Sequence, residues 1–164
     1  MPDPAHVTQE EWDVWRAFLQ MRRQLDLALE HQLQRDADIS IADFGILMSL
    51  LEAPDKQLRA GELSQKLAWE KSRVSHQVSR MEKRGLVERR LCDSDARGTW
   101  VGLTPAGSRA VLGAMREHSA TLRQHFFDAL SPAELAAIKS ASHRVLDTIT
   151  PLDAISPLDA TGAE

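Results

Sequence analysis

The chain has 164 residues, of which 43% are hydrophobic and 27% are charged, and its formal net charge is −4. This composition is ordinary for a soluble globular protein, and the length suits one compact domain or a small domain with helical extensions. The single cysteine, Cys92, excludes an internal disulfide, and no apolar run approaches the ~20 residues that span a bilayer. The first residues contain no basic segment followed by an apolar stretch, so we expect no secretory signal and a cytoplasmic protein.

The charge is unevenly distributed along the chain. Residues 59–104 carry 10 Lys or Arg against 6 Asp or Glu, whereas residues 1–58 carry 5 against 11 and residues 105–164 carry 5 against 7. A negative total argues against a nucleic-acid partner, but the local distribution matters more than the sum. A basic middle segment, residues 59–104, thus lies between two acidic flanks.

Two helices are predicted in the first third of the chain by their capping residues. Thr8 followed by Glu11, and Ser40 followed by Asp43, have the spacing of a capping box, in which each side chain binds the other residue's backbone N–H. Apolar residues then recur at helical spacing. The predicted helices span residues 8–35 and 40–52.

Two shorter helices and a hairpin are predicted next. The helices cover residues 58–67 and 70–85, and Gly85 serves as the left-handed cap of the second. LVERRLC then alternates as a strand, DSDARG turns the chain, and TWVGLT returns as a second strand. Helix, short turn, helix and hairpin in a basic stretch is the order of a winged helix-turn-helix.

The last third of the chain is predicted to be helical. Thr104 and Pro105 indicate the start of a helix that continues to about Leu130, and Ser131 with Pro132 indicates the start of another. PLDA then occurs at 151–154 and again at 157–160, in what we interpret as a loosely packed extension. The expected fold is mainly α with a small β wing, an α+β class.

No motif indicates catalysis or a cofactor. HExxH, CxxC, GxSxG and a glycine-rich phosphate loop are all absent from the sequence, so we expect a protein that is not an enzyme. The histidines are scattered, and His118 and His125, two helical turns apart, lack further metal ligands in the sequence pattern. We therefore expect no metal site and no cofactor.

The helix over residues 70–85 has a face suited to DNA. At about 100° per residue, Val74, Val78 and Met81 cluster on one side. The opposite side carries hydrogen-bond donors and no acid, and residues near the start of such a helix contact bases while later ones contact phosphate. The predicted DNA-binding residues are Ser72, Arg73, Ser75 and His76 near bases, Arg80 and Lys83 near the backbone, and Ser79 on the same face. The alternative is a solvated charged face on an ordinary helix.

Residues 60–107 resemble the multiple-antibiotic-resistance regulator (MarR) family of bacterial transcription factors. The matching stretches are ELSQKL, VSHQVSRMEKRGLVERR, DSDARG and LTPAG. The family's wing commonly has Asp-x-Arg-Gly, then Leu-Thr, then a helix starting near Gly, and this chain has those residues in order. Two positions depart from the common pattern, namely His76, where an Arg is frequent, and Trp100, which is large for the returning wing strand.

The resemblance implies an obligate homodimer that binds double-stranded DNA, and hence a nucleoid-associated location. In family terms Arg97 enters the minor groove, Asp95 braces it by an ion pair, and we expect Gly98 to let the chain reverse close to the duplex. The implied domains are an N-terminal dimerisation helix (8–38), the winged helix-turn-helix (39–104), C-terminal dimerisation helices (105–150) and the extension (151–164). Apolar stripes on the flanking helices favour a partner surface independently, the alternative being that they fold back within one chain.

A small-molecule effector is implied by the same resemblance, because family members bind aromatic anions between the dimer helices and the winged domain. Trp12, Trp15 and Phe44 are the candidate pocket residues, with Arg16, or else Arg22 or Arg23, supplying the charge. Packing in the core or the dimer explains the aromatic residues equally well, so both interpretations stay open. Some family members sense oxidants through cysteines, but we favour a structural role for Cys92.

The predicted function is that of a transcriptional regulator, a repressor in the family pattern, which binds a near-palindromic operator and is released by a small aromatic anion or an oxidant. The rival hypothesis is a winged-helix module that binds protein instead of DNA. The acid-free helix face counts against that rival, because a protein-binding module does not require it.

Overall fold

The computed structural model describes residues 6–92 and 95–149. Its helices are α1 (Gln9–Ala37), α2 (Ile41–Glu52), α3 (Ala60–Leu67), α4 (Lys71–Lys83), α5 (Pro105–Leu122) and α6 (Pro132–Thr148), with a 3-10 turn, η1 (Pro54–Lys56), and a π-helical turn, η2 (Arg123–Phe127). Its strands are β1 (Gln57–Arg59), β2 (Val87–Cys92) and β3 (Asp95–Leu103), which form an antiparallel sheet in the order β1-β3-β2. The prediction of a mainly helical fold with a small β wing is confirmed.

The helix starts follow the capping pattern of the sequence. The Thr8 hydroxyl accepts the Glu11 backbone N–H at 3.2 Å, and the Glu11 carboxylate accepts the Thr8 N–H at 2.7 Å. Capping boxes of the same kind begin α2 at Ser40 and α6 at Ser131, and Thr104 caps α5. Gly85 follows α4 with a φ of 70°, the left-handed conformation expected of it.

Strand β1 was not predicted, and its presence shortens the third helix. Residues 58 and 59 were expected to be helical, but Leu58 pairs with Val101 and Arg59 with Trp100 in the sheet. The helix begins only at Ala60, where the Glu62 carboxylate accepts the Arg59 backbone N–H at 2.6 Å. A three-residue strand is too short to show periodicity, and pairing with β3 is a long-range contact that local pattern does not reveal.

The fifth helix also differs from the prediction. It was expected to continue to about Leu130, but α5 ends at Leu122 and passes into η2, where the Asp128 N–H donates to the Arg123 carbonyl at 2.8 Å. A π-turn widens the helix by one residue and re-aims the chain without any Gly or Pro. The sequence has neither residue between Gly113 and Pro132, so nothing in it indicated the interruption.

The core lies within the winged domain, which we define as α2, β1, α3, α4, β2 and β3, with one side of α1 and α5 closing it. Leu47, Leu63, Val78, Val101 and Val111 come from five different elements, and each is at most 1% exposed. The first turn of α5 is packed especially closely. A Cβ at Gly107 would lie 2.1 Å from the Leu86 carbonyl oxygen, so only glycine allows α5 to start against the end of α4.

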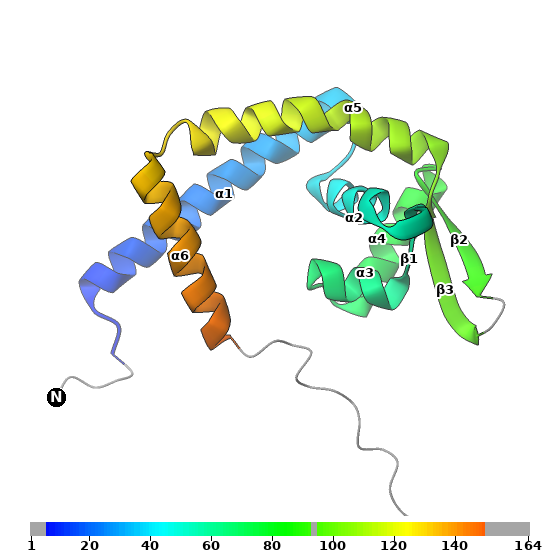
Figure 1. Ribbon diagram of the computed structural model, residues 1–164, viewed down its shortest axis with the longest axis horizontal. Helices are drawn as coiled ribbons and strands as arrows, with labels where there is room; N and C mark the ends of the chain where they lie inside the picture. The colour runs from blue at the N-terminus through cyan, green and yellow to red at the C-terminus, as the bar shows by residue number, and fades with distance from the viewer. Residues whose placement is uncertain (1–5, 93–94, 150–164) are drawn as a thin grey trace, which may run out of the picture.

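The scaffold helices, defined as α1, α5 and α6, leave much apolar surface uncovered. α5 runs alongside α1, while α6 descends from the far end of α5 (Figure 1). No residue of α6 is buried, and Val145 and Leu146 are 57% and 63% exposed. On the first half of α1 the exposed large apolar residues are Trp12, Val14, Trp15, Phe18 and Met21.

None of the helices within residues 6–92 and 95–149 has the length and hydropathy that a membrane span requires.

Candidate nucleic-acid interface

Helix α4 is fixed in the winged domain by one apolar face. Ala68, with a φ of 51°, makes the left-handed turn between α3 and α4. Val74, Val78 and Met81 are at most 1% exposed, which confirms the inward side predicted from the helical wheel. Gln77 is also buried, at 7% exposure, and it was not singled out from the sequence. The opposite side of α4 therefore faces away from the core.

The predicted DNA-binding residues of α4 share that outward side. Of these residues only Ser79 is partly buried. Most of them contribute to a hollow of about 640 Å³, and no residue lining it is acidic. The hollow is lined by Arg73, His76, Ser79, Arg80 and Lys83, together with Ala42 and Gln77. This concave and basic surface is suited to an anionic partner such as the phosphate backbone.

Arg73 does not extend freely from the helix. Its guanidinium lies 4.0 Å from the centre of the Trp69 ring, in the turn before α4. A cation over an aromatic face is attracted by the ring's quadrupole, and the contact restricts the side chain's conformations. Arg73 is thereby held near the start of α4, where a recognition helix contacts bases.

Arg89 of β2 attaches the wing to α4, a role that sequence analysis missed. Its guanidinium donates to the Glu82 carboxylate at 3.0 Å, and to the Ser79 hydroxyl and the Ser75 carbonyl at 2.9 Å each. The Ser79 hydroxyl itself donates to the Ser75 carbonyl at 2.9 Å. Ser79 therefore serves the junction between wing and helix, and it has little capacity left for a further partner.

The alternation of strand β2 contained the signal for this contact. Val87 and Arg89 lie on the same side of the strand, and Val87 is 1% exposed. An arginine on the core side of a wing strand must find partners, and the polar side chains of the neighbouring helix are the nearest candidates.

Trp100 has a structural partner that explains part of its size. It lies between Arg59 of β1 and Arg90 of β2 in one rung of the sheet, and the Arg59 guanidinium is 5.3 Å from the ring centre. The next residue, Val101, faces the core, so Trp100 occupies the outer face of the wing. The ring thus connects β3 to β1 through its contact with Arg59.

The comparisons with known proteins agree with this geometry. A sequence model of the MarR family matches residues 37–98. The crystal structure of Sco3205, a MarR family transcriptional regulator from Streptomyces coelicolor in complex with DNA, is 34% identical, with a TM-score of 0.87 over 96% of this chain and 98% of that chain. The chain belongs to the MarR family. Its members are transcription regulators and not enzymes.

Other MarR-family structures resemble the chain over most of its length. AbsC, also a MarR family transcriptional regulator from Streptomyces coelicolor, is 34% identical, with a TM-score of 0.81 over 87% of this chain and 95% of that chain. A mutant MarR from E. coli, complexed with operator DNA, is 24% identical and has a TM-score of 0.76 over 87% of this chain and 99% of that chain, a likeness of fold. The comparison with curated proteins found no match.

The wing residues that carry the MarR resemblance are placed only in part. The family match extends to Gly98, and Asp95, Arg97 and Gly98 belong to β3, which pairs with β2. Their side chains lie outside the described residues. The minor-groove role of Arg97 and the bracing role of Asp95 therefore stay predictions.

The four residues predicted to line an effector pocket in this MarR-family chain are not brought together. Phe44 packs against His118 with ring centres 4.4 Å apart, and His118 lies 3.3 Å from the Gln32 side-chain oxygen. Burial lowers the pKa of His118. Trp15, however, stacks on Phe18, and at about 1.5 Å per residue it is about 25 Å along α1 from Gln32. Trp12, at 45% exposure, and Arg16, paired with Asp13, lie at the same distant end of α1.

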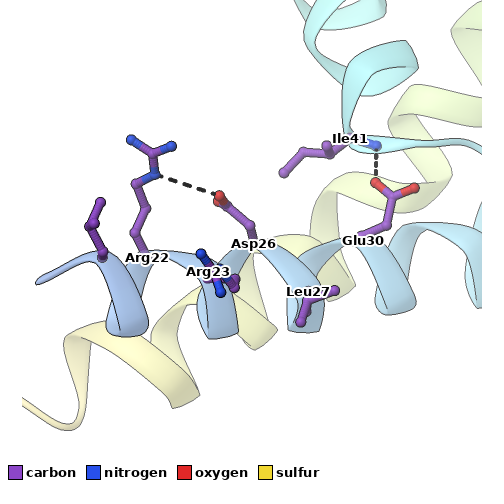
Figure 2. A pocket seen from close by; sticks show the side chains of 7 residues that line it. Arg22, Arg23, Asp26, Leu27, Glu30 and Ile41 are labelled. Atoms are coloured by element: carbon purple, nitrogen blue, oxygen red, sulfur yellow. Dashed lines mark hydrogen bonds and ion pairs between the residues drawn. The ribbon is translucent and has the colours of Figure 1, made fainter. Parts of the chain in front are cut away.

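A different hollow, of about 350 Å³, lies between α1 and the start of α2 (Figure 2). Arg22 points toward Asp26, 3.9 Å away, and the Glu30 carboxylate accepts the Ile41 backbone N–H at 2.6 Å. The remaining lining residues are Leu19, Arg23 and Leu27. It combines apolar walls with the guanidinium groups of Arg22 and Arg23 and the carboxylates of Asp26 and Glu30. The two arginines are among the residues predicted from the sequence to supply the charge for an effector.

No group of three or more His, Cys, Asp or Glu residues is arranged to hold a metal ion within the part of the chain that the structure describes.

Proposed function

We propose that this chain is a sequence-specific DNA-binding transcriptional regulator, a repressor, that binds a near-palindromic operator as a homodimer. The observation that carries the proposal is the outward side of α4, where donors gather around a basic hollow without any acid. Arg and Lys there suit phosphate, while Ser, His and Arg also match the edges of bases in the major groove. The DNA complex of the relative Sco3205 supports the same partner for this chain.

The exposed apolar residues of α1 and α6 support the homodimer. Monomeric proteins rarely leave many large apolar residues together in water, and here such residues are exposed along the first half of α1 and along α6, which has no buried residue. A second copy related by a two-fold axis would cover both surfaces and place two α4 helices in successive major grooves. The half-sites are then expected about one helical turn, ~10 bp, apart.

Selection from a random DNA pool tests the proposal. The full chain is incubated with random duplexes, and the bound fraction is amplified and sequenced through several rounds. We expect enrichment of a two-fold symmetric sequence with the half-site spacing given above. A pool that stays random after selection, with the protein folded, would overturn sequence-specific binding and favour the rival hypothesis of a winged-helix module that binds protein.

Two substitutions test how the wing and helix α4 each contribute to DNA binding. We expect Arg97→Ala to weaken binding of the selected duplex by about tenfold or more, because a hydrogen bond that involves a charged group is worth about 1.5–3 kcal/mol. His76→Ala should change the preference at one base pair, whereas an equal loss on all sequences would assign His76 to phosphate. Arg116→Ala, on a side chain that is 93% exposed on α5, is the matched control and should leave both properties unchanged.

A second proposal concerns the effector. We propose that a small aromatic anion binds the hollow of Arg22 and Arg23, because this hollow has apolar walls beside guanidinium groups. Benzoate titrated into the protein–duplex complex should release the DNA in wild type and fail to do so in Arg23→Ala. If benzoate and related aromatic anions leave DNA affinity unchanged in wild type, this proposal fails while DNA binding stands. Release by an oxidant is tested in the same assay with peroxide.

A further inference from the structure

Asp43 has partners that its helix-capping role does not require. Its side chain is 3% exposed, and one carboxylate oxygen accepts the Ser40 backbone N–H at 2.9 Å, which is the capping bond. The same oxygen accepts a guanidinium N–H of Arg84 at 2.8 Å, and the other accepts the side-chain amide of Gln77 at 2.6 Å. Gln77 and Arg84 belong to α4 and its C-cap, so a buried carboxylate of α2 holds the recognition helix.

The Asp43 carboxylate also determines the orientation of the Gln77 side-chain amide. An ionised carboxylate accepts hydrogen bonds and cannot donate, so the NH₂ end of Gln77 must face Asp43. The carbonyl end is then turned outward, where it accepts an N–H of Arg80 at 2.7 Å. Arg80 lines the basic hollow of α4. A chain of polar contacts thus runs from Asp43 through Gln77 to the outward side of the recognition helix.

The two anchors lie on one side of α4. Gln77 and Arg84 are seven residues apart, which corresponds to about two turns, or ~10 Å, of helix. Two attachment points on one side of α4, both made to the Asp43 carboxylate, restrict the rotation of α4 about its axis and its tilt more than a single point would. Arg84 additionally donates to the Asp38 carbonyl at the end of α1. The orientation of α4 is therefore tied to α2 and to a scaffold helix.

We propose that Asp43 is a positioning residue for DNA sequence recognition: it sets the orientation of α4 and, through Gln77, the placement of the Arg80 guanidinium. The proposal rests on the proposed function, since it concerns how DNA is discriminated. Asp43→Asn should disturb it specifically. The amide NH₂ that this substitution introduces can face Gln77, and the Gln77 amide must then reverse and turn its own NH₂ toward Arg80. Otherwise the new NH₂ faces the N–H groups of Ser40 and Arg84, which lose their acceptor.

The experiment compares operator with random DNA. Dissociation constants of the full chain are measured for the duplex selected by wild type and for a random duplex of equal length. Asp43→Asn and Gln77→Met should each weaken operator binding by about tenfold, the worth of one hydrogen bond to a charged group, and random-duplex binding by less than about twofold. Gln77→Met keeps the size of the side chain and the Ser40 cap, so it covers the case in which Asp43→Asn fails to fold.

Two controls separate positioning from loss of structure. Glu134→Gln weakens a capping box at the start of α6, which lies apart from α4 (Figure 1), and it should leave the operator-to-random ratio unchanged. In an Arg80→Ala background, Gln77→Met should reduce operator affinity clearly less than it does in wild type, because Gln77 is proposed to act through its hydrogen bond with Arg80.

The outcomes distinguish the two proposals. An operator-to-random ratio unchanged in both variants, or equal losses on both duplexes, would overturn the positioning role while sequence-specific binding by wild type stands. Equal losses from Gln77→Met with and without Arg80 would overturn the route through Arg80. If wild type itself shows no preference for any duplex, the proposed function fails, and this inference fails with it.

Discussion

The winged domain and the scaffold helices bury their apolar residues to very different extents. Residues such as Leu47, Leu50 and Met81 of the winged domain are fully buried within one chain. On the scaffold, α6 has no buried residue, and Phe18 of α1 is 45% exposed. The winged domain is thus complete within one copy, whereas the scaffold helices have surfaces that a single copy does not cover.

This difference separates two roles. The part that contacts DNA must keep its side chains in fixed positions, and here buried apolar packing and the bonds of Arg89 and Asp43 supply that order. In the proposed homodimer, the scaffold helices set the spacing between two winged domains, and they need a partner surface instead. Three predictions, from the largest expected effect to the smallest, test whether the two parts respond in these different ways.

The largest effect is expected from charge on the apolar side of α6. Val145→Glu combined with Leu146→Glu should give a monomer in sedimentation experiments, because two carboxylates would be buried between the copies. Operator affinity should fall by about 10²–10⁴-fold, since two half-sites would no longer be bound by one linked assembly. Ser140→Glu, on the opposite side of α6, is the matched control and should stay dimeric. A dimer that persists in the double variant would contradict the assigned interface.

A smaller effect is expected in the core of the winged domain. Leu47→Ala should lower the free energy of unfolding by about 3 kcal/mol, since it leaves a cavity at a fully buried site. The difference from wild type should be the same at every protein concentration, because Leu47 does not contact a second copy in the proposed dimer. Denaturant titration at two concentrations measures this, and a difference that varies with concentration would mean that the winged domain is not complete within one chain.

The smallest effect is expected from Asp43 and depends on pH. Burial raises the pKa of its carboxyl, but bonds from Ser40, Arg84 and Gln77 outweigh burial and leave the pKa below its ordinary value. The ionised form therefore stabilises the fold above the unfolded-state pKa of about 4, and this contribution is lost as the pH falls through the lower pKa of the folded state.

Asp43→Asn should accordingly cost about 2 kcal/mol of unfolding free energy at pH 7, the worth of its charged hydrogen bonds. The difference from wild type should shrink as the pH falls below about 4. Chemical denaturation at a series of pH values measures it. A difference that stays constant in acid would show that the Asp43 carboxylate is not held ionised by its neighbours.

Local features of the fold were predictable from the sequence, and long-range ones were not. The caps at Thr8, Ser40 and Ser131 were identified because a capping box acts over three residues. Strand β1 was missed because it pairs with β3, more than 40 residues later. The π-turn after Leu122 was missed because no residue type there breaks a helix.

The candidate site shows the same limit. The outward side of α4 followed from a helical wheel, and its residues lie where the wheel put them. Asp43 was identified as a cap, but its bonds to residues 34 and 41 positions later depend on how two helices pack. Trp12 and Phe44 were grouped by residue type and by the pocket that the family resemblance implies, and the length of α1 separates them within one chain.

The central claim, that this chain discriminates DNA sequence through its winged domain, is tested most directly by fluorescence anisotropy of the full chain. The duplex selected by wild type and a random duplex are titrated at several salt concentrations. The account predicts binding of the selected duplex about 10³-fold or more tighter than of the random one, and affinity for both that falls steeply with salt. Equal affinity for the two duplexes, or affinity that does not change with salt, would contradict it.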